Sequence, residues 1–274
     1  MNKSPIFILA NPRSGSSAFR LILNSTKDSV FPPECGFIQW LYPKYKDWNT
    51  NMVESFSIDV HQSKKMEGWK LSQIPLINYI KTSNPKTYAE ACYFVYKYYG
   101  ELNGKTPKVW GDKNNYYIQY LDTISEIYPN AKYIWLNRNP MDVCASYLKV
   151  NELSDTIKYK PKVSNDINEI FAEIKQNANK IEDFLQKIVK NNKLLVNFED
   201  ILTKNQNSLD EISEFVGIDM NLALTNFDKK LYFDEPSITM GWKQKTMQKL
   251  DSNYVNTYKL HPKAKEIELI YREL

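Results

Sequence analysis

The sequence predicts a three-layer α/β fold in which a central parallel β-sheet is flanked by helices. Two observations support this prediction. Short apolar runs bounded by polar turn residues recur along the chain, and segments with helical spacing lie between them. Strands that alternate with helices imply right-handed crossovers and therefore a parallel sheet. The chain shows no internal repeat and no low-complexity linker, so we expect residues 1–274 to form a single domain.

The elements follow from local pattern. Apolar runs predict strands at 5–10, near Val30, and at 108–111, 131–136 and 194–198. Apolar residues at three- and four-residue steps predict helices at 16–24, 86–103, 115–128, 141–149, 166–190 and 209–216, with Pro140 in the first turn of the fourth. A proline-rich stretch after Val30, up to residue 50, predicts a loop. Residues 51–85 and 229–274 have patterns too weak to assign.

Composition excludes several classes of protein. The chain has 36 basic and 32 acidic residues, and its lysines are spread along the sequence, so we expect no nucleic-acid partner. The three cysteines, Cys35, Cys92 and Cys144, form neither a disulfide framework nor a zinc motif, so we expect no metal site. No stretch approaches the ~20 apolar residues of a membrane span. Together these features favour a cytoplasmic location.

The loop after the first predicted strand is a candidate anion site. ANPRSGSS, residues 10–17, joins a buried strand to a helix N-terminus, where backbone N–H groups and the helix dipole favour negative charge. Compared with the nucleotide-kinase loop G-x-x-x-x-G-K-[ST], Gly15 and Ser17 match, but Ala10 replaces the first glycine and Ser16 replaces the lysine. No aspartate ends the 131–136 strand to bind magnesium. These differences count against a P-loop kinase, which stays as an alternative beside a non-catalytic nucleotide-binding protein.

A second candidate anion site follows the 131–136 strand. Arg138 comes directly after it, and Ser146 lies eight residues later, about two helical turns along the next helix. Arginine offers a planar fork to phosphate and serine offers a hydroxyl. Taken alone, the pair favours the plainer interpretation, in which Arg138 is a surface loop residue and Ser146 occupies a solvated helix position.

Three blocks of sequence together resemble sulfotransferases that use 3′-phosphoadenosine 5′-phosphosulfate (PAPS). PRSGSSAFRLIL is similar to the family's 5′-phosphosulfate loop, and NAKYIWLNRNPMDVCASYLK is similar to its 3′-phosphate element, usually R-D-P-R-D-V-x-x-S. VNFEDILTKNQNSLDEISEFVGID resembles the region after that element. The blocks occur in the expected order and span roughly residues 5–220. The chain departs from the pattern at Asn139, Met141 and Phe198, where the family usually has Asp, Arg and Tyr.

The resemblance implies a P-loop-like fold and a set of binding residues. Arg13 and the backbone of Ser14, Gly15, Ser16 and Ser17 would hold the 5′-phosphosulfate, and Arg138 and Ser146 would hold the 3′-phosphate. Lys243, in GWKQK, would cover that phosphate. The donor would be PAPS, the product adenosine 3′,5′-bisphosphate, and no metal would be required. With arginine at position 13, the loop resembles that of tyrosylprotein sulfotransferases and of many bacterial sulfotransferases.

The resemblance also implies the catalytic residues Glu34, Arg13 and Lys113. Glu34, in PPECGF, matches the carboxylate base of the tyrosylprotein type in character and approximate spacing, and Lys113, in WGDKNN, would stabilise charge on the sulfuryl oxygens. Lys113 is equally compatible with a solvated lysine. His61 and Asp112 stay open as other bases, whereas His261 is expected at the surface.

The acceptor is not identified by the sequence. Five aromatic residues between positions 35 and 50 could stack on a sugar ring or a phenol, although an ordinary core is the favoured interpretation of Phe37, Trp40, Tyr42, Tyr45 and Trp48. A small-molecule or glycan acceptor is therefore expected, and the sequence leaves the oligomeric state open.

Overall fold

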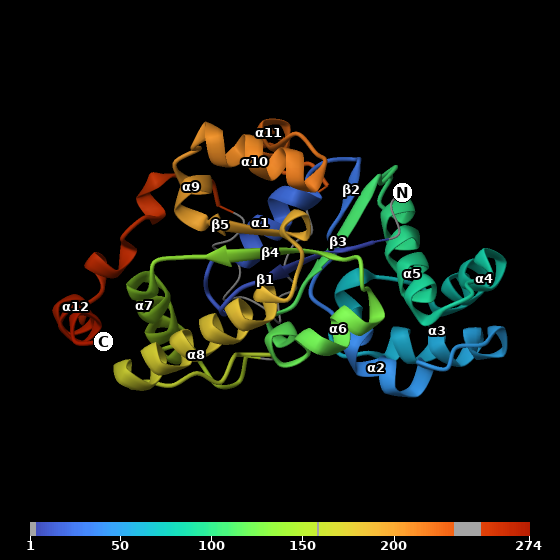
Figure 1. Cartoon of the computed structure of the whole chain (residues 1–274), viewed down its shortest axis with the longest axis horizontal. Coiled ribbons are helices and arrows are strands. Elements are labelled where there is room, and N and C mark those ends of the chain that lie inside the picture. The colour runs from blue at the N-terminus through green and yellow to red at the C-terminus, as the bar shows by residue number, and fades with distance from the viewer. Residues whose placement is uncertain (1–3, 158, 233–247) are drawn as a thin grey trace.

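Five parallel strands form the centre of the computed structural model, which describes residues 4–157, 159–232 and 248–274 (Figure 1). The strands are β1 (Ile6–Leu9), β2 (Ser29–Val30), β3 (Val109–Lys113), β4 (Lys132–Asn137) and β5 (Lys193–Asn197). Their order is β2-β3-β1-β4-β5, and every neighbouring pair is parallel. The predicted α/β fold with a central parallel sheet is therefore confirmed.

The helices lie on both faces of the sheet and at its ends. They are α1 (Ser16–Asn24), α2 (Phe37–Tyr45), α3 (Val53–Gln62), α4 (Gln73–Ser83), α5 (Tyr88–Leu102), α6 (Leu121–Ile127), α7 (Pro140–Asn151), α8 (Ile167–Gln186), α9 (Phe198–Leu202), α10 (Gln206–Val216), α11 (Met220–Asp228) and α12 (Ala264–Arg272). In Figure 1, α1, α9, α10 and α11 lie above the sheet, and α7 and α8 lie below it.

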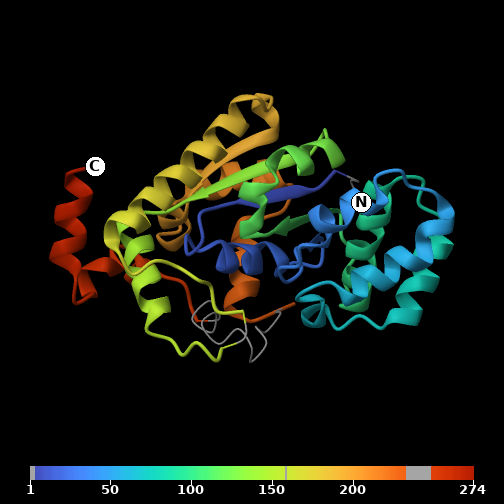
Figure 2. The ribbon, with the colours of Figure 1, turned by 90° about the horizontal axis from the view of Figure 1, so that it is seen from below.

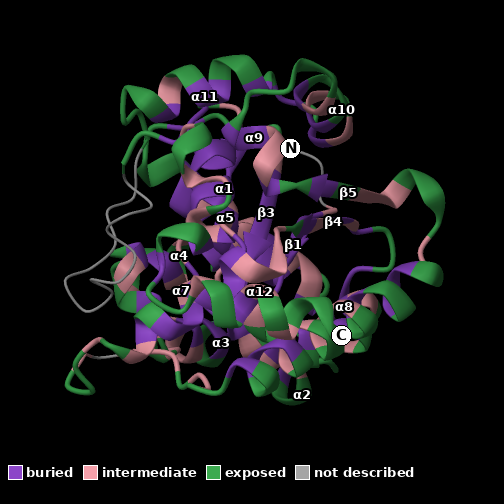
Figure 3. Cartoon of the chain, turned by 90° about the vertical axis from the view of Figure 1, so that its left-hand side faces the viewer, coloured by how far each residue is buried: buried purple, intermediate pink, exposed green. Residues whose placement is uncertain are grey.

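Alternation along β1 explains how the sheet holds two cores. Ile6 and Ile8 pack with α1, α10 and α11, whereas Phe7 and Leu9 pack with α5, α6 and α8. Successive side chains of a strand point to opposite faces, so a strand buried on both faces must be apolar throughout. Figure 3 shows buried residues gathered at the centre of the molecule and exposed residues on the outer helices. All residues of β1 are buried, whereas only Val196 is buried in β5, at the edge of the sheet. The continuous apolar run in the sequence is the direct consequence.

One sequence prediction is wrong in this part of the chain. The stretch after Val30 was expected to be a loop up to residue 50, but it contains α2. Phe37, Ile38 and Tyr45 have helical spacing and are buried in the core, and their burial outweighs the backbone hydrogen bond that Pro43 cannot donate. Residues 51–85, which the sequence left unassigned, form α3, α4 and two short 3₁₀ turns. Figures 1 and 2 show α2–α5 gathered at one end of the molecule and α12 at the other.

Smaller differences concern the ends of elements. The helix expected at 115–128 is a 3₁₀ turn followed by α6, because the backbone at Tyr120 leaves the helical region. Phe198, expected to end a strand, opens α9 instead. The predictions did not include α11 or α12. Within the described residues, no helix is both long and apolar enough to cross a membrane.

Candidate active site

The loop between β1 and α1 has the backbone of an anion-binding site. The amide of Ser14 donates to the carbonyl of Asn11 over 3.2 Å, and Arg13 and Gly15 both have left-handed backbones, with φ of 72° and 86°. Helix α1 begins at Ser16 without a side-chain cap. The N–H groups of its first turn therefore lack a capping side chain, and the positive end of the helix dipole faces the loop.

Two features favour glycine at position 15: its left-handed backbone and the ring of Phe198 beside it. A Cβ atom at Gly15 would lie 2.5 Å from the ring of Phe198, far inside van der Waals contact. The same ring lies 5.5 Å from the guanidinium carbon of Arg138. Phe198 therefore packs against both candidate anion sites, a role that its position in the sequence did not indicate.

The two arginines meet at this loop. Arg13 Nε donates to Ser146 Oγ over 3.0 Å, and Arg138 Nη1 donates to the carbonyl of Arg13 over 3.4 Å. Arg138 Nη2 also donates to the carbonyl of Tyr254 over 3.1 Å and lies 3.7 Å from a carboxylate oxygen of Asp142. The structure thus brings Arg13, Arg138 and Ser146 together, although Arg138 reaches Ser146 only through Arg13.

Positive charge is concentrated at this meeting point. Burial, and then the charge of Arg138, lower the pKa of Arg13. Burial also lowers the pKa of Arg138, although Asp142 opposes that shift. Two partly desolvated cations that repel one another favour an anionic ligand, because it would relieve both penalties.

A second cluster surrounds Glu34. Its carboxylate forms an ion pair with Lys113 through Oε1 and a second ion pair with Lys65 through Oε2, the latter at 3.1 Å. Only 7% of the Glu34 side chain, 2% of Lys113 and 14% of Lys65 are exposed. Burial lowers the pKa of Lys113 and the charge of Glu34 opposes that shift. Glu34 is also among the charges that act on Arg13, so the two clusters lie within electrostatic reach of one another.

Asp112 lies beside this cluster but belongs to the core. It is fully buried, accepts hydrogen bonds from the hydroxyl of Tyr117 and the amide of Lys113, and has no exposed surface. Burial raises the pKa of Asp112 to about 6, against the effect of the Tyr117 hydrogen bond. An enclosed carboxyl of this kind holds β3 and Lys113 in place, and it cannot reach an acceptor without rearrangement.

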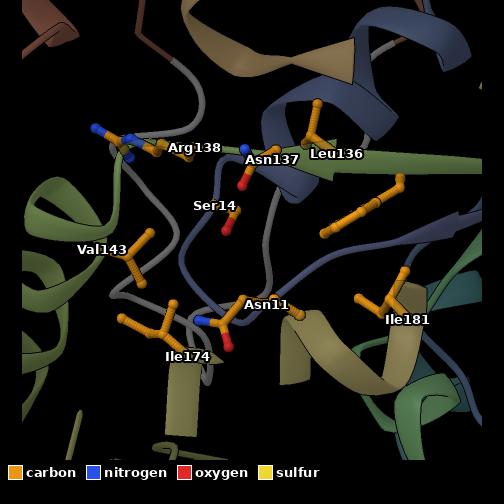
Figure 4. Close-up of a pocket in the computed structure, with 10 residues that line it drawn as sticks. Asn11, Ser14, Leu136, Asn137, Arg138, Val143, Ile174 and Ile181 are labelled. Carbon is orange, nitrogen blue, oxygen red and sulfur yellow. The ribbon is translucent and has the colours of Figure 1, made fainter. Parts of the chain in front are cut away.

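A polar network joins the β1–α1 loop to α7 and α8. Asn177 donates to Asn11 Oδ1 over 2.7 Å, Asn11 donates to the hydroxyl of Tyr147 over 3.3 Å, and that hydroxyl donates to Glu173 over 3.0 Å. Figure 4 shows Asn11, Ser14 and Arg138 around one space beside the end of β4. This cleft, including the part open to solvent, has a volume of about 290 Å³.

The remaining sequence predictions have different outcomes. Ser17 lies half-buried in the first turn of α1 beside Ser16, which is buried. His61 lies in the last turn of α3, and its imidazole makes no hydrogen bond or ion pair with any residue that the structure describes. Lys243 lies outside the described residues. His261 was expected at the surface, which is wrong: it is only 6% exposed, because it packs where the chain turns into α12, and its Nδ1 accepts the amide of Lys263.

Sequence reasoning missed several residues of the site. Lys65 lies in the unassigned stretch, where no motif marked it. Asn11 lies in the loop that was singled out, but its bonds to α7 and α8 come from sequence-distant partners. The expectation of a core role for the aromatic residues is confirmed for Phe37 and Tyr45, which are buried, whereas Trp40 is partly exposed.

The chain is similar to known sulfotransferases in sequence and in fold. A model of the sulfotransferase family matches residues 5–221. The sulfotransferase domain from the curacin biosynthetic pathway is similar in structure, with a TM-score of 0.63 and 18% identity, over 98% of this chain and 97% of that domain. The sulfotransferase domain of the Synechococcus PCC 7002 olefin synthase gives a TM-score of 0.62 and 19% identity, over 99% and 96%. At these identities the likeness shows the fold. No curated protein sequence matches the chain significantly.

Proposed function

The chain belongs to the sulfotransferase family, and from this premise we propose that it transfers a sulfuryl group from PAPS to a hydroxyl or amine acceptor. The observation that best supports the proposal is the buried ion pair between Glu34 and Lys113, within electrostatic reach of Arg13. A carboxylate, an ammonium and a guanidinium at one place provide a base and two stabilisers of developing negative charge.

The donor would bind along the carboxyl ends of β1 and β4. Arg13 and the amides of the α1 N-terminus would hold the 5′-phosphosulfate, and Arg138 and Ser146 would hold the 3′-phosphate. Arg138 fits this role because its Nε is buried and has no hydrogen-bond partner among the described residues. A buried unpaired donor is costly, and a phosphate oxygen would satisfy it. Lys243 as a further cover for the phosphate stays a prediction.

The donor supplies an activated sulfuryl group, and the chain supplies position and charge. Glu34 would accept the proton from the acceptor while the acceptor's oxygen or nitrogen forms a bond to sulfur. The bond between sulfur and the 5′-phosphate oxygen breaks, and that oxygen keeps the electron pair. Lys113 would face the sulfuryl oxygens and Arg13 the departing phosphate, where negative charge increases.

Turnover of PAPS tests the proposal. The release of adenosine 3′,5′-bisphosphate would be followed with separate panels of phenols, alcohols, monosaccharides and amines. We expect at least one class to raise release above the rate in buffer. Release that no class raises, together with tight bisphosphate binding, would favour a non-catalytic binding protein. Phosphate transfer from Mg-ATP to any panel member would favour a kinase.

A further inference from the structure

Glu34 is held by two ammonium groups, and the proposed reaction uses only one of them. Lys113 pairs with Oε1, whereas Lys65 Nζ lies 3.1 Å from Oε2. The two lysines come from different parts of the fold: Lys113 ends β3, and Lys65 lies in the turn after α3. The carboxylate is therefore fixed from two independent directions.

The backbone at Lys65 is in a conformation that lysine rarely adopts. Its φ is 72°, in the left-handed region, and it directly precedes the 3₁₀ turn Met66–Trp69. Met66 and Trp69 are buried, and the indole of Trp69 donates to the carbonyl of Pro33, next to Glu34. The turn is thus anchored to the segment that carries Glu34, and the anchoring directs the Lys65 side chain towards it.

Lys65 is enclosed on its other side as well. The ring of Tyr159 lies 5.9 Å from Nζ, and the Tyr159 hydroxyl donates to Glu67 over 2.8 Å. Burial lowers the pKa of Lys65, but the charge of Glu34 and their hydrogen bond outweigh it, so that the net shift is upward. Lys65 therefore stays cationic beside the carboxylate.

We propose that Lys65 is a positioning residue that keeps Glu34 oriented and ionised when Lys113 turns to the sulfuryl group of the donor. With Lys113 engaged elsewhere and no cation at Oε2, the carboxylate would lose both of these ion pairs, its pKa at this depth would rise, and it would act less well as a base. Lys65 prevents this loss because it keeps its ion pair with Oε2, so that the carboxylate stays ionised and Oε1 is free to face the acceptor. The inference rests on the proposed function, because it presupposes that Glu34 is the base.

Several charged and titratable groups surround the pair, so the test must separate Lys65 from them. Lys113, Lys65, Arg13 and Asp112 act on Glu34, and Arg20 acts on Lys113. Cys35, Tyr116 and Tyr159 lie near Lys65, and Glu67 lies near Cys35 and Tyr159. Burial raises the pKa of Cys35 to about 12, so this thiol stays neutral in the range of interest.

The experiment is a carbon-13 NMR titration of the glutamate carboxyls in the full chain with bound adenosine 3′,5′-bisphosphate. The Glu34 signal is identified by its loss in Glu34→Gln. In Lys65→Met, we expect the midpoint of this signal to move up by about one pH unit, because one adjacent cation is lost. Lys65→Arg should restore the midpoint.

Lys70→Met is the matched control. Lys70 ends the same 3₁₀ turn, also has a left-handed backbone, with φ of 53°, and is exposed away from Glu34. An unchanged midpoint in Lys65→Met, or an equal shift in Lys70→Met, would overturn the inference.

Turnover distinguishes this inference from the function on which it rests. If Glu34→Gln keeps full turnover of PAPS, the base assignment in the proposed function fails. If Glu34→Gln is inactive but the acid limb of the pH–rate profile is the same in Lys65→Met as in the unaltered chain, the inference alone fails. We expect that limb to move to higher pH in Lys65→Met, with bisphosphate affinity unchanged.

Discussion

The donor side and the acceptor side of this site are built in different ways. The donor side, around Arg13 and Arg138, uses two short segments that each follow a strand, and the Nε of Arg138 is buried without a partner among the described residues. The acceptor side joins Glu34, Lys65 and Lys113, three residues separated by tens of positions, into a cluster in which one carboxylate pairs with two ammonium groups. The donor side thus keeps a hydrogen-bond donor for an anion, whereas both lysines of the acceptor side are already paired with a carboxylate of the chain.

This difference has a physical consequence. A buried guanidinium donor without a partner favours binding of an anion, so substitutions on the donor side should act mainly on affinity. A paired carboxylate contributes little to binding an anion, so substitutions on the acceptor side should act mainly on turnover. The predictions below test this division, beginning with the largest expected effect.

Glu34→Gln should abolish most turnover and leave donor-side binding intact. Loss of a general base costs about a hundredfold to ten-thousandfold in rate, and glutamine keeps the size of the side chain. The measurement is bisphosphate release from PAPS, with bisphosphate affinity determined on the same preparation. A parallel loss of affinity would show that the two sides are not separable.

Gly15→Ala should destabilise the donor side. The new methyl group overlaps the ring of Phe198 at 2.5 Å, and alanine is strained at φ of 86°. Together these effects should lower the free energy of unfolding by about 2–4 kcal/mol. Denaturant unfolding measures this change. Gly104→Ala is the control, because Gly104 has φ of 69° but no atom within 4 Å of its added Cβ, so it retains only the strain. Equal losses in both variants would exclude the ring contact as a cause.

Arg138→Gln should weaken bisphosphate binding about tenfold to a hundredfold, because a hydrogen bond to a charged group contributes about 1.5–3 kcal/mol. Turnover at saturating PAPS should change much less. Calorimetry and steady-state kinetics measure the two quantities. A loss confined to the maximal rate would contradict the assignment of Arg138 to the donor side.

Asp112→Asn should change how the free energy of unfolding depends on pH. Folding raises the pKa of Asp112 to about 6 from its ordinary 3.8. The folded chain therefore holds a proton between these values that the unfolded chain has released, and stability falls as pH rises through this window. Each pKa unit corresponds to about 1.4 kcal/mol. Asp112→Asn should flatten the fall between pH 4 and 6 in urea unfolding. An unchanged slope would show that another group is responsible.

The donor side was largely predictable from sequence, and the acceptor side was not. A glycine between a buried apolar run and a helix indicates a tight anion-binding turn by local backbone geometry alone, which is how residues 13–17 were found. Lys65 depends on the position of a turn after α3, in a stretch without clear periodicity, and on packing of Trp69 near Pro33. Such a contact is set by tertiary packing, which no local pattern encodes. The same reasoning explains why the sequence did not predict α2: the burial of one face stabilises this helix more than Pro43 destabilises it.

The most direct test of the account is a calorimetric titration of the purified chain with adenosine 3′,5′-bisphosphate and, separately, with Mg-ATP. We expect tight binding of the bisphosphate, no binding of Mg-ATP, and loss of the bisphosphate signal in Arg13→Ala. Preference for Mg-ATP, or bisphosphate binding that Arg13→Ala leaves unchanged, would contradict the donor site on which the account depends.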